Sequence, residues 1–276
     1  MSKKVVLITG ASSGMGKVTA LKLIHEGHIV YGAARRVEKM NDLVKAGGHA
    51  IKMDITDDSS VKNAVNRVIN EQGQIDVLMN NAGFGSYGSV EETSIEDARY
   101  QLEVNLLGLA RITQLVIPHM RKRNSGQIIN ISSVGGKVYT PLGAWYHATK
   151  HALEGWSDCL RLELEQFGIN VVIIEPGIIE TEFGDVVYEP MLKRSGNGPY
   201  KNMARSVAQA TKSAYEKGGG SSPMVIANTV SRSIKKKKPS TRYVVGKLAK
   251  PLLFIRKWFS DRIFDKAVMS QIKSME

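Results

Sequence analysis

A continuous apolar run, residues 5–8, is followed at once by a glycine-rich turn, residues 9–16, and this pair leaves few folds open to the chain. Four apolar residues without polar alternation are typical of a strand buried on both faces of a parallel sheet. A helix-like stretch, residues 17–26, follows the turn. Strand, glycine turn and helix in this order point backbone N–H groups and a helix N-terminus at a phosphate. The opening therefore predicts a phosphate-binding unit, with a purely structural turn as the alternative.

Five further apolar runs recur along the first two thirds of the chain, separated by helix-like stretches. They cover residues 28–34, 50–53, 77–79, 127–131 and 170–174. Strands that alternate with helices pair in parallel, and ligands bind such sheets beyond the carboxyl ends of the strands. Every candidate site residue comes just after such an end. The pattern predicts an α/β fold, with a doubly wound parallel sheet in three α/β/α layers.

Two arginines, Arg35 and Arg36, directly follow the second predicted strand, after Ala34. In a dinucleotide site an acidic residue near this position binds a ribose 2′-hydroxyl, whereas arginine accommodates a 2′-phosphate. The pair therefore favours NADP(H) over NAD(H), and a solvated basic pair is the alternative. Asp54 follows the third predicted strand, where its carboxylate could meet the adenine edge of the cofactor.

Polar residues also follow later strands and interrupt one helix. Asn81, Ala82 and Gly83 come where the chain must turn close to a cofactor, although plain turn chemistry is an alternative. Asn105 lies in apolar company within a predicted helical stretch, residues 94–120. A buried amide is costly unless it is hydrogen-bonded, so Asn105 should either help to bend this helix or position a water.

Tyr146 and Lys150 are spaced one helical turn apart if a helix begins near Ala144. A free phenol titrates near ~10, and a nearby cation lowers that pKa towards the range that a general acid or base needs. The spacing therefore predicts a proton-transferring pair, with an ordinary helix surface as the alternative.

Together these residues and their order resemble the short-chain dehydrogenase/reductase family over about residues 3–190. The resemblance adds Ser133, thirteen residues before the tyrosine. The motifs are T-G-x-x-x-G-x-G at Thr9 to Gly16, N-N-A-G at Asn80 to Gly83, the helix asparagine at Asn105, Y-x-x-x-K at Tyr146 to Lys150, and P-G-x-x-x-T at Pro176 to Thr181.

The resemblance implies a one-domain Rossmann fold and reversible hydride transfer between a nicotinamide cofactor and an alcohol or carbonyl carbon. It implies that Tyr146 donates a proton to the carbonyl oxygen and Ser133 hydrogen-bonds that oxygen. Lys150 would lower the pKa of the phenol and hold the nicotinamide ribose, and Asn105 would support a water leading to Lys150. The implied cofactor-binding residues are Gly10, Ser12, Ser13, Gly14, Met15, Gly16, Arg35, Arg36, Asp54, Ile55, Asn81, Ala82, Gly83, Tyr146, Lys150, Pro176, Gly177, Ile179 and Thr181.

The charge distribution and the cysteine content limit which other classes of protein this chain could belong to. The chain carries 38 Lys and Arg against 26 Asp and Glu, and residues 185–276 hold 19 of the former but only 6 of the latter. No nucleic-acid-binding motif accompanies this charge, so we expect no nucleic-acid partner. The single cysteine, Cys159, excludes an intramolecular disulfide framework, and the short N-terminal apolar run is no membrane span. We expect a cytoplasmic protein, with Cys159 in a helix as a small core residue.

The chain is expected to divide into a Rossmann and catalytic core over residues 1–190, a substrate lid over 183–220 in the same domain, and a last strand region with a basic amphipathic helical tail over 221–276. Apolar lid residues such as Phe183 suit an apolar carbonyl or alcohol substrate, and lids of this kind occur on steroid, retinoid and lipid-modifying relatives. The basic tail could dock on the domain, join subunits or lie on an anionic membrane surface.

Relatives suggest a homodimer or homotetramer. His147 and His151 share the spacing of helical zinc ligands, but no third ligand is evident, so we expect surface histidines and no metal. A catalytically idle cofactor-binding scaffold or regulatory protein is the functional alternative.

Overall fold

The computed structural model describes residues 3–215 and 218–273. Within them a single parallel sheet has the strand order β3-β2-β1-β4-β5-β6-β7. Six strands match the predicted apolar runs to within two residues at either end, and the doubly wound fold is confirmed. The strands are β1 (Val5–Thr9), β2 (Ile29–Ala34), β3 (His49–Lys52), β4 (Val77–Asn80), β5 (Gly126–Ile131), β6 (Ile169–Pro176) and β7 (Arg242–Val245).

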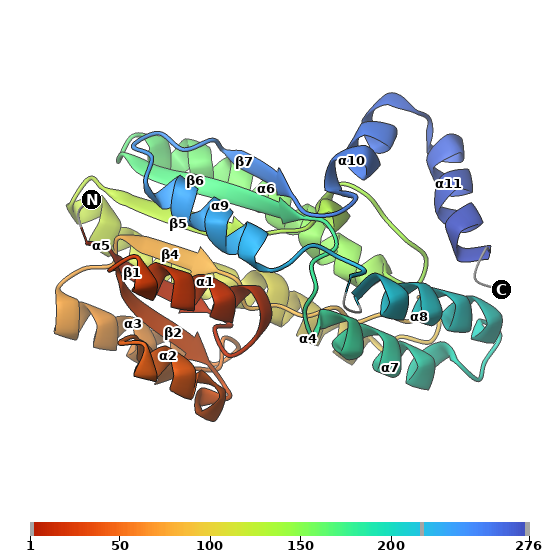
Figure 1. The fold of residues 1–276 in the computed structure, drawn as a ribbon, viewed down its shortest axis with the longest axis horizontal. Helices are drawn as coiled ribbons and strands as arrows, with labels where there is room; N and C mark the ends of the chain where they lie inside the picture. Colours follow the sequence, from red (N-terminus) through yellow and green to blue (C-terminus); the bar gives the residue numbers. More distant parts are fainter. Residues whose placement is uncertain (1–2, 216–217, 274–276) are drawn as a thin grey trace.

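Helices cover both faces of the sheet, and Figure 1 shows the strands pointing towards the side where the later helices gather. The helices are α1 (Gly14–His25), α2 (Asn41–Lys45), α3 (Asp58–Gln72), α4 (Ile95–Leu102), α5 (Gly108–Lys122), α6 (Ala144–Glu165), α7 (Phe183–Ser195), α8 (Lys201–Tyr215), α9 (Met224–Ile234), α10 (Ala249–Trp258) and α11 (Asp261–Lys273). Short 3₁₀ turns lie at Val37–Met40 and Val134–Gly136, and a π-helical turn lies at Glu103–Leu107.

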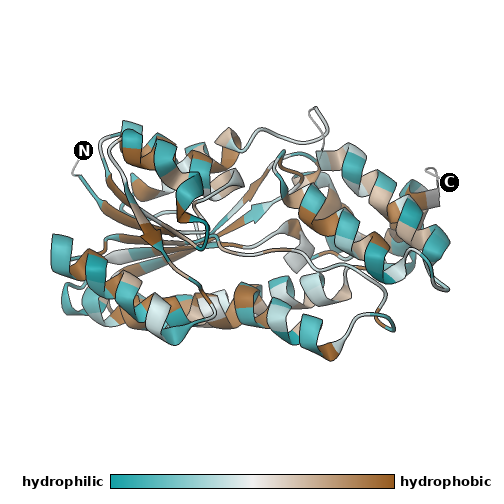
Figure 2. Cartoon of the chain, turned by 90° about the horizontal axis from the view of Figure 1, so that it is seen from below, coloured by the Kyte–Doolittle hydropathy of each residue, from teal (hydrophilic) through white to brown (hydrophobic). Residues whose placement is uncertain are grey.

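The side chains of β1 point alternately to the two faces of the sheet, which explains why this strand is apolar at every position from Val5 to Ile8. Val5 and Leu7 pack with α3, α5 and α6 on one face of the sheet, whereas Val6 and Ile8 pack with α1, α2 and α9 on the other. Successive side chains of a strand point to opposite faces, so a strand covered on both sides must be apolar at every position. Figure 2 shows the brown strands between two layers of helices.

The edge strand β7 was not delimited by its sequence, and an arginine joins it to the rest of the sheet. Arg242 donates hydrogen bonds to Glu154 and Asp158 of α6, at 3.1 and 2.6 Å, and to Glu175 of β6 at 3.1 Å. Burial of Glu175 beside Glu154 raises its pKa to about 7. This contact between distant segments has no periodic signature in the sequence.

The chain after β6 forms two pairs of helices beyond the carboxyl ends of the strands. Helices α7 and α8 form an antiparallel hairpin, and α11 packs against α8 (Figure 1). Helix α10 packs against the turn that follows β5. One expectation fails in this half of the molecule, because Cys159 is exposed on α6 and is no core residue.

Candidate active site

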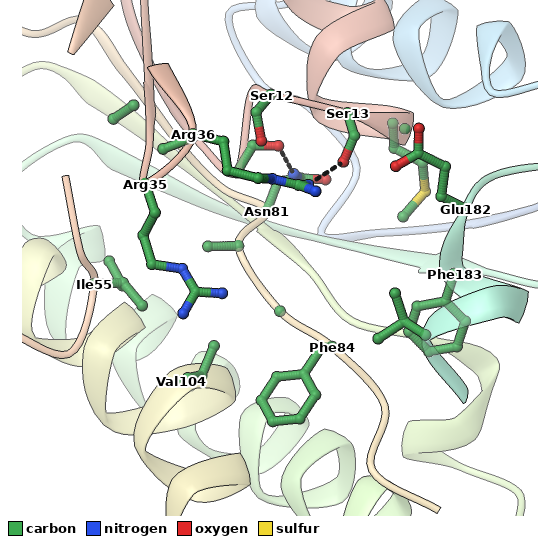
Figure 3. A pocket seen from close by; sticks show the side chains of 18 of the residues that line it. Ser12, Ser13, Arg35, Arg36, Ile55, Asn81, Phe84, Val104, Glu182 and Phe183 are labelled. Atoms are coloured by element: carbon green, nitrogen blue, oxygen red, sulfur yellow. Dashed lines mark hydrogen bonds between the residues drawn. The ribbon is translucent and has the colours of Figure 1, made fainter. Parts of the chain in front are cut away.

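A cavity of about 390 Å³ opens beyond the carboxyl ends of the first four strands (Figure 3). Of the predicted cofactor-binding residues, its lining includes Gly10, Ser12, Ser13, Gly14, Met15, Arg35, Arg36, Asp54, Ile55, Asn81, Ala82, Gly83 and Thr181. The predicted residues outside this lining are Gly16, Tyr146, Lys150, Pro176, Gly177 and Ile179. The cavity therefore gathers residues from five separate loops, as the order of the motifs predicts.

The glycine turn after β1 is shaped by close backbone contacts. Gly10 has a φ of +68°, and a Cβ atom there would lie 2.9 Å from the Cα of Ala82. A Cβ on Gly16 would lie 2.5 Å from the carbonyl oxygen of Gly10. A side chain at either position would push α1 or the loop after β4 away. Gly16 thus acts through the packing of the turn and not by facing the cavity.

Asn81 fastens the loop after β4 to this turn. Its side-chain amide donates to the carbonyl oxygens of Thr9 and Gly10, at 3.0 and 3.1 Å. In return, the hydroxyl oxygen of Thr9 accepts from the backbone N–H groups of Asn81 and Ala82, both at 3.0 Å. These four hydrogen bonds therefore hold the two loops together where they line the cavity.

The start of α1 and the end of β2 make one end of the cavity suited to anions. Ser13 occupies the N-cap position of α1 without capping it through its side chain. Its hydroxyl instead accepts from Arg36 at 3.4 Å. Arg35 reaches the hydroxyl of Tyr100 at 3.0 Å. Uncapped N–H groups, a helix dipole and two guanidinium groups fit the phosphates of a dinucleotide.

Tyr146 and Lys150 lie on the same buried side of α6, with exposed fractions of 8% and 7%. The ammonium of Lys150 donates to the carbonyl oxygen of Ile131 at 2.9 Å. Ser133 hydrogen-bonds the phenol of Tyr146, and its hydroxyl also accepts from the N–H of Gly135 at 3.0 Å. The end of β5 and the start of α6 thus bring three of the four predicted catalytic side chains into one group.

Burial shifts the pKa values of Tyr146 and Lys150, and the shift of Tyr146 is opposite to the one predicted from the sequence. Burial raises the pKa of Tyr146, and the hydrogen bond with Ser133 only partly opposes this rise. Burial lowers the pKa of Lys150 to about 8, with the charge of Glu154 opposing. The expected lowering of the pKa of Tyr146 by Lys150 is therefore wrong for the protein as described, because loss of water outweighs any charge effect.

Asn105 sits in the π-helical turn between α4 and α5. Its side-chain oxygen accepts from the N–H of Phe84 at 3.0 Å, and its amide donates to the carbonyl oxygen of Phe84 at 2.9 Å and to Thr149 at 3.2 Å. A Cβ on Gly83 would lie 3.2 Å from the Asn105 oxygen and 3.9 Å from the Lys150 nitrogen. Asn105 therefore occupies the π-helical turn and joins α6 to the loop that carries Gly83.

The inner end of the site is aromatic. The ring of Tyr146 lies 5.8 Å from that of Tyr87 and 5.7 Å from that of Phe183, which in turn lies 5.6 Å from Tyr215. Phe183 also lines the cavity, so it joins the cavity to Tyr146. Figure 3 shows Glu182 and Phe183 across the cavity from Arg35. The lining residues that the sequence analysis did not single out for the cofactor site are Ala33, Ala34, Met53, Phe84, Tyr100, Val104, Glu182, Phe183 and Val186.

His147 is buried, which corrects the expectation of a surface histidine. Its Nε2 accepts from the N–H of Thr140 at 3.1 Å, so its Nδ1 carries the proton and donates to the carbonyl oxygen of Gly135 at 2.9 Å. His151 is exposed and its ring contacts the carbonyl of His147. No group of three metal-ligating side chains occurs within residues 3–215 and 218–273. His147 instead fixes the loop beside Ser133.

Comparison with known proteins identifies the family. Residues 4–191 match the family model of the short chain dehydrogenases. A 3-ketodihydrosphingosine reductase of Bacteroides thetaiotaomicron is 36% identical over 269 residues, covering 97% of each chain. An NADPH-dependent 3-dehydrocapnine reductase of Ornithobacterium rhinotracheale is 32% identical over 287 residues, covering 99% of this chain and 98% of the relative. The crystal structure of a short-chain dehydrogenase from Streptomyces avermitilis gives a TM-score of 0.84 at 34% identity, covering 99% of this chain and 98% of that one. The chain belongs to the short-chain dehydrogenase/reductase family of oxidoreductases.

Proposed function

We propose that this protein is an NADP(H)-dependent reductase of an apolar ketone or aldehyde, with oxidation of the secondary alcohol as the reverse reaction. One observation carries the proposal. Phe183 touches both the ring of Tyr146 and the cavity whose far end holds Arg35 and Arg36. The acid, the phosphate-binding turn and the basic end thus form one continuous site.

The cavity fits a nicotinamide dinucleotide. Gly10 and Gly16 let the turn pack closely on the loop after β4, and the start of α1, which has no side-chain cap, is free to meet the pyrophosphate. Arg35 and Arg36 would hold a 2′-phosphate, which supports NADP(H) over NAD(H). The relative that is named NADPH-dependent supports the same preference. When bound, this cofactor supplies or accepts the hydride.

The raised pKa of Tyr146 supports work in the reducing direction. A phenol that keeps its proton at neutral pH can donate it to a carbonyl oxygen, and the Ser133 hydroxyl can hydrogen-bond the same oxygen. Lys150, with a pKa of about 8, could restore the proton, and Asn105 would position a water between Lys150 and solvent.

The substrate is proposed to be lipid-like. Aromatic and aliphatic side chains surround the phenol, and few charges could recognise a polar substrate there. Two relatives carry names that specify a keto or dehydro group at position 3 and a reductase activity. The α7–α8 hairpin, residues 183–215, is proposed as the substrate lid, since Phe183 covers Tyr146. Steroid-like and retinoid-like carbonyls belong to the same apolar class.

The test is a screen of carbonyl compounds that follows NADPH absorbance, with Tyr146→Phe as the control. We expect turnover of long-chain or cyclic apolar ketones and loss of at least about 100-fold in kcat in the variant, while NADPH still binds. NADPH binding without turnover of any compound would instead support the scaffold alternative. Undiminished turnover by Tyr146→Phe would refute the assigned acid. Homodimer or homotetramer assembly and cytoplasmic location stay predictions.

A further inference from the structure

An exposed aromatic patch lies on α10 and the residues that follow it. We define the aromatic patch as Phe254, Trp258, Phe259 and Ile263. Phe254 and Trp258 are 59% and 65% exposed. The Phe254 ring lies 6.5 Å from that of Trp258 and 6.4 Å from that of Phe259, so the aromatic members form one surface. A contiguous apolar surface of this kind marks an interaction site.

The aromatic patch is not needed to hold α10 in place. Ala249, Leu252, Leu253 and Ile255 pack against a buried cluster that includes Phe264. These residues occupy other positions of the helix than Phe254 and Trp258. The helix is therefore anchored through one side, while its large aromatic residues remain in water.

The charge around the aromatic patch has one dominant sign. Helix α10 contains Lys250, Arg256 and Lys257 and no carboxylate. The Lys257 ammonium lies 5.1 Å from the Trp258 ring centroid. Two further exposed cations, Arg262 and Lys266, follow on α11.

The carboxylates nearest to these cations already have partners. Asp261 pairs with Arg256, and Asp265 accepts from the hydroxyl of Tyr139 at 2.9 Å. Five cations, Lys250, Arg256, Lys257, Arg262 and Lys266, stand against only these two carboxylates, so the rim around the aromatic patch is net positive.

We infer that α10 and the start of α11 bind the surface of an anionic lipid bilayer. Tryptophan and phenylalanine suit the boundary between headgroups and acyl chains, and lysine or arginine beside them attracts anionic headgroups. A second copy of this chain fits the surface less well. A two-fold dimer would place the same positive rim on both sides of the contact. None of the described helices is long and apolar enough to cross a bilayer.

The aromatic patch is joined to the catalytic half of the molecule. Val268, Met269 and Ile272 of α11 pack with α7 and α8, and Phe264 lies 5.1 Å from Tyr139 in the segment after Ser133. The aromatic patch lies at the start of α11, and the hairpin packs against the other end of this helix, so α11 connects the two (Figure 1). The bilayer binding does not rest on the proposed function.

The experiment is sedimentation of the full chain with vesicles of phosphatidylcholine alone and of phosphatidylcholine mixed with phosphatidylserine. We expect pelleting with the mixed vesicles and its loss in high salt. Phe254→Ser/Trp258→Ser should weaken binding by about tenfold or more, because two large apolar side chains no longer enter the interface. Leu162→Ser is the matched control, since Leu162 is 64% exposed on α6 away from the aromatic patch.

A second pair of variants separates local charge from total charge. Lys250→Glu/Lys257→Glu should weaken vesicle binding by about tenfold or more. Lys236→Glu/Lys237→Glu changes net charge equally in the exposed lysine run after α9 and should have little effect. The inference is refuted if the wild type fails to pellet, or if both pairs behave alike. It is also refuted if Phe254→Ser/Trp258→Ser lowers the oligomeric state in light scattering, because the aromatic patch would then be a subunit contact.

Discussion

The ring of Phe183 lies 5.7 Å from the ring of Tyr146, so the first residue of α7 covers the phenol on α6. Tyr146 is 8% exposed, and burial is the main cause of its raised pKa. The pKa of the Tyr146 phenol therefore depends on where α7 lies.

Phe183→Ala should lower the pKa of Tyr146, because water would reach a phenol that is now shielded. The rate of carbonyl reduction, which needs the protonated phenol, should then begin to fall at a lower pH than in the wild type. The measurement is the pH profile of kcat/KM, with ultraviolet titration of tyrosinate against Tyr146→Phe. An unchanged profile would show that Phe183 does not control this burial.

Arg35→Ala/Arg36→Ala should weaken NADPH binding by about 10- to 100-fold and leave NADH binding nearly unchanged, because hydrogen bonds to charged groups contribute about 1.5–3 kcal/mol. Fluorescence titration with both cofactors measures the effect. Arg99→Ala, at an exposed position of α4, is the control for a general loss of positive charge. Equal weakening for both cofactors would contradict a 2′-phosphate site.

His147→Leu should destabilise the protein by about 1–3 kcal/mol, because the N–H of Thr140 and the carbonyl of Gly135 lose their partners. It should also lower kcat, since this loop carries Ser133. The exposed His151→Gln is the matched control. Denaturant unfolding and steady-state kinetics are the measurements, and equal effects of the two variants would refute the assignment.

Acidic pH should lower the free energy of unfolding of the wild type through protonation of His147. Burial lowers the pKa of His147 below its usual 6.5, so the unfolded chain takes up this proton first. The stability contributed by neutral His147 is present above pH 6.5 and is lost as the pH falls below it. Denaturant unfolding between pH 7 and pH 5 should show a smaller decrease for His147→Leu than for the wild type.

Lys150 should give the cofactor-free protein a signature of the same sign at alkaline pH. Its pKa falls from 10.5 to about 8 on folding, so between these values the unfolded chain binds more protons and stability rises with pH. The rise should be absent in Lys150→Met. Denaturant unfolding from pH 8 to pH 9.5 tests this, because tyrosines with raised pKa values stay protonated there. If the free energy of unfolding changes with pH equally in the wild type and in Lys150→Met, the lowered pKa of Lys150 is refuted.

The sequence predicted the sheet and its loops well because buried parallel strands need unbroken apolar runs. Val5 to Ile8 had to be apolar at every position to serve both faces, and the turn from Thr9 to Gly16 had to follow. The position of Arg35 and Arg36 at the cavity could be predicted for the same reason, since a strand end determines where the next residues lie. Local periodicity is enough for such predictions.

The features that were missed depend on contacts between distant segments. The raised pKa of Tyr146 depends on its burial, and the residues that cover it include Phe183, thirty-seven positions later in the chain. The burial of His147 depends on the loop from Gly135 to Thr140 folding back over α6. Helical spacing gives the side of a helix, but it does not tell which side another segment will cover.

Helix α11 touches the segment after Ser133 near its start and α8 near its carboxyl end, so the last described helix connects the α7–α8 hairpin to the loop that carries Ser133. A protease nick or bulky fusion near residue 264 would loosen both contacts at once. For laboratory work this favours affinity tags at the other terminus, next to β1.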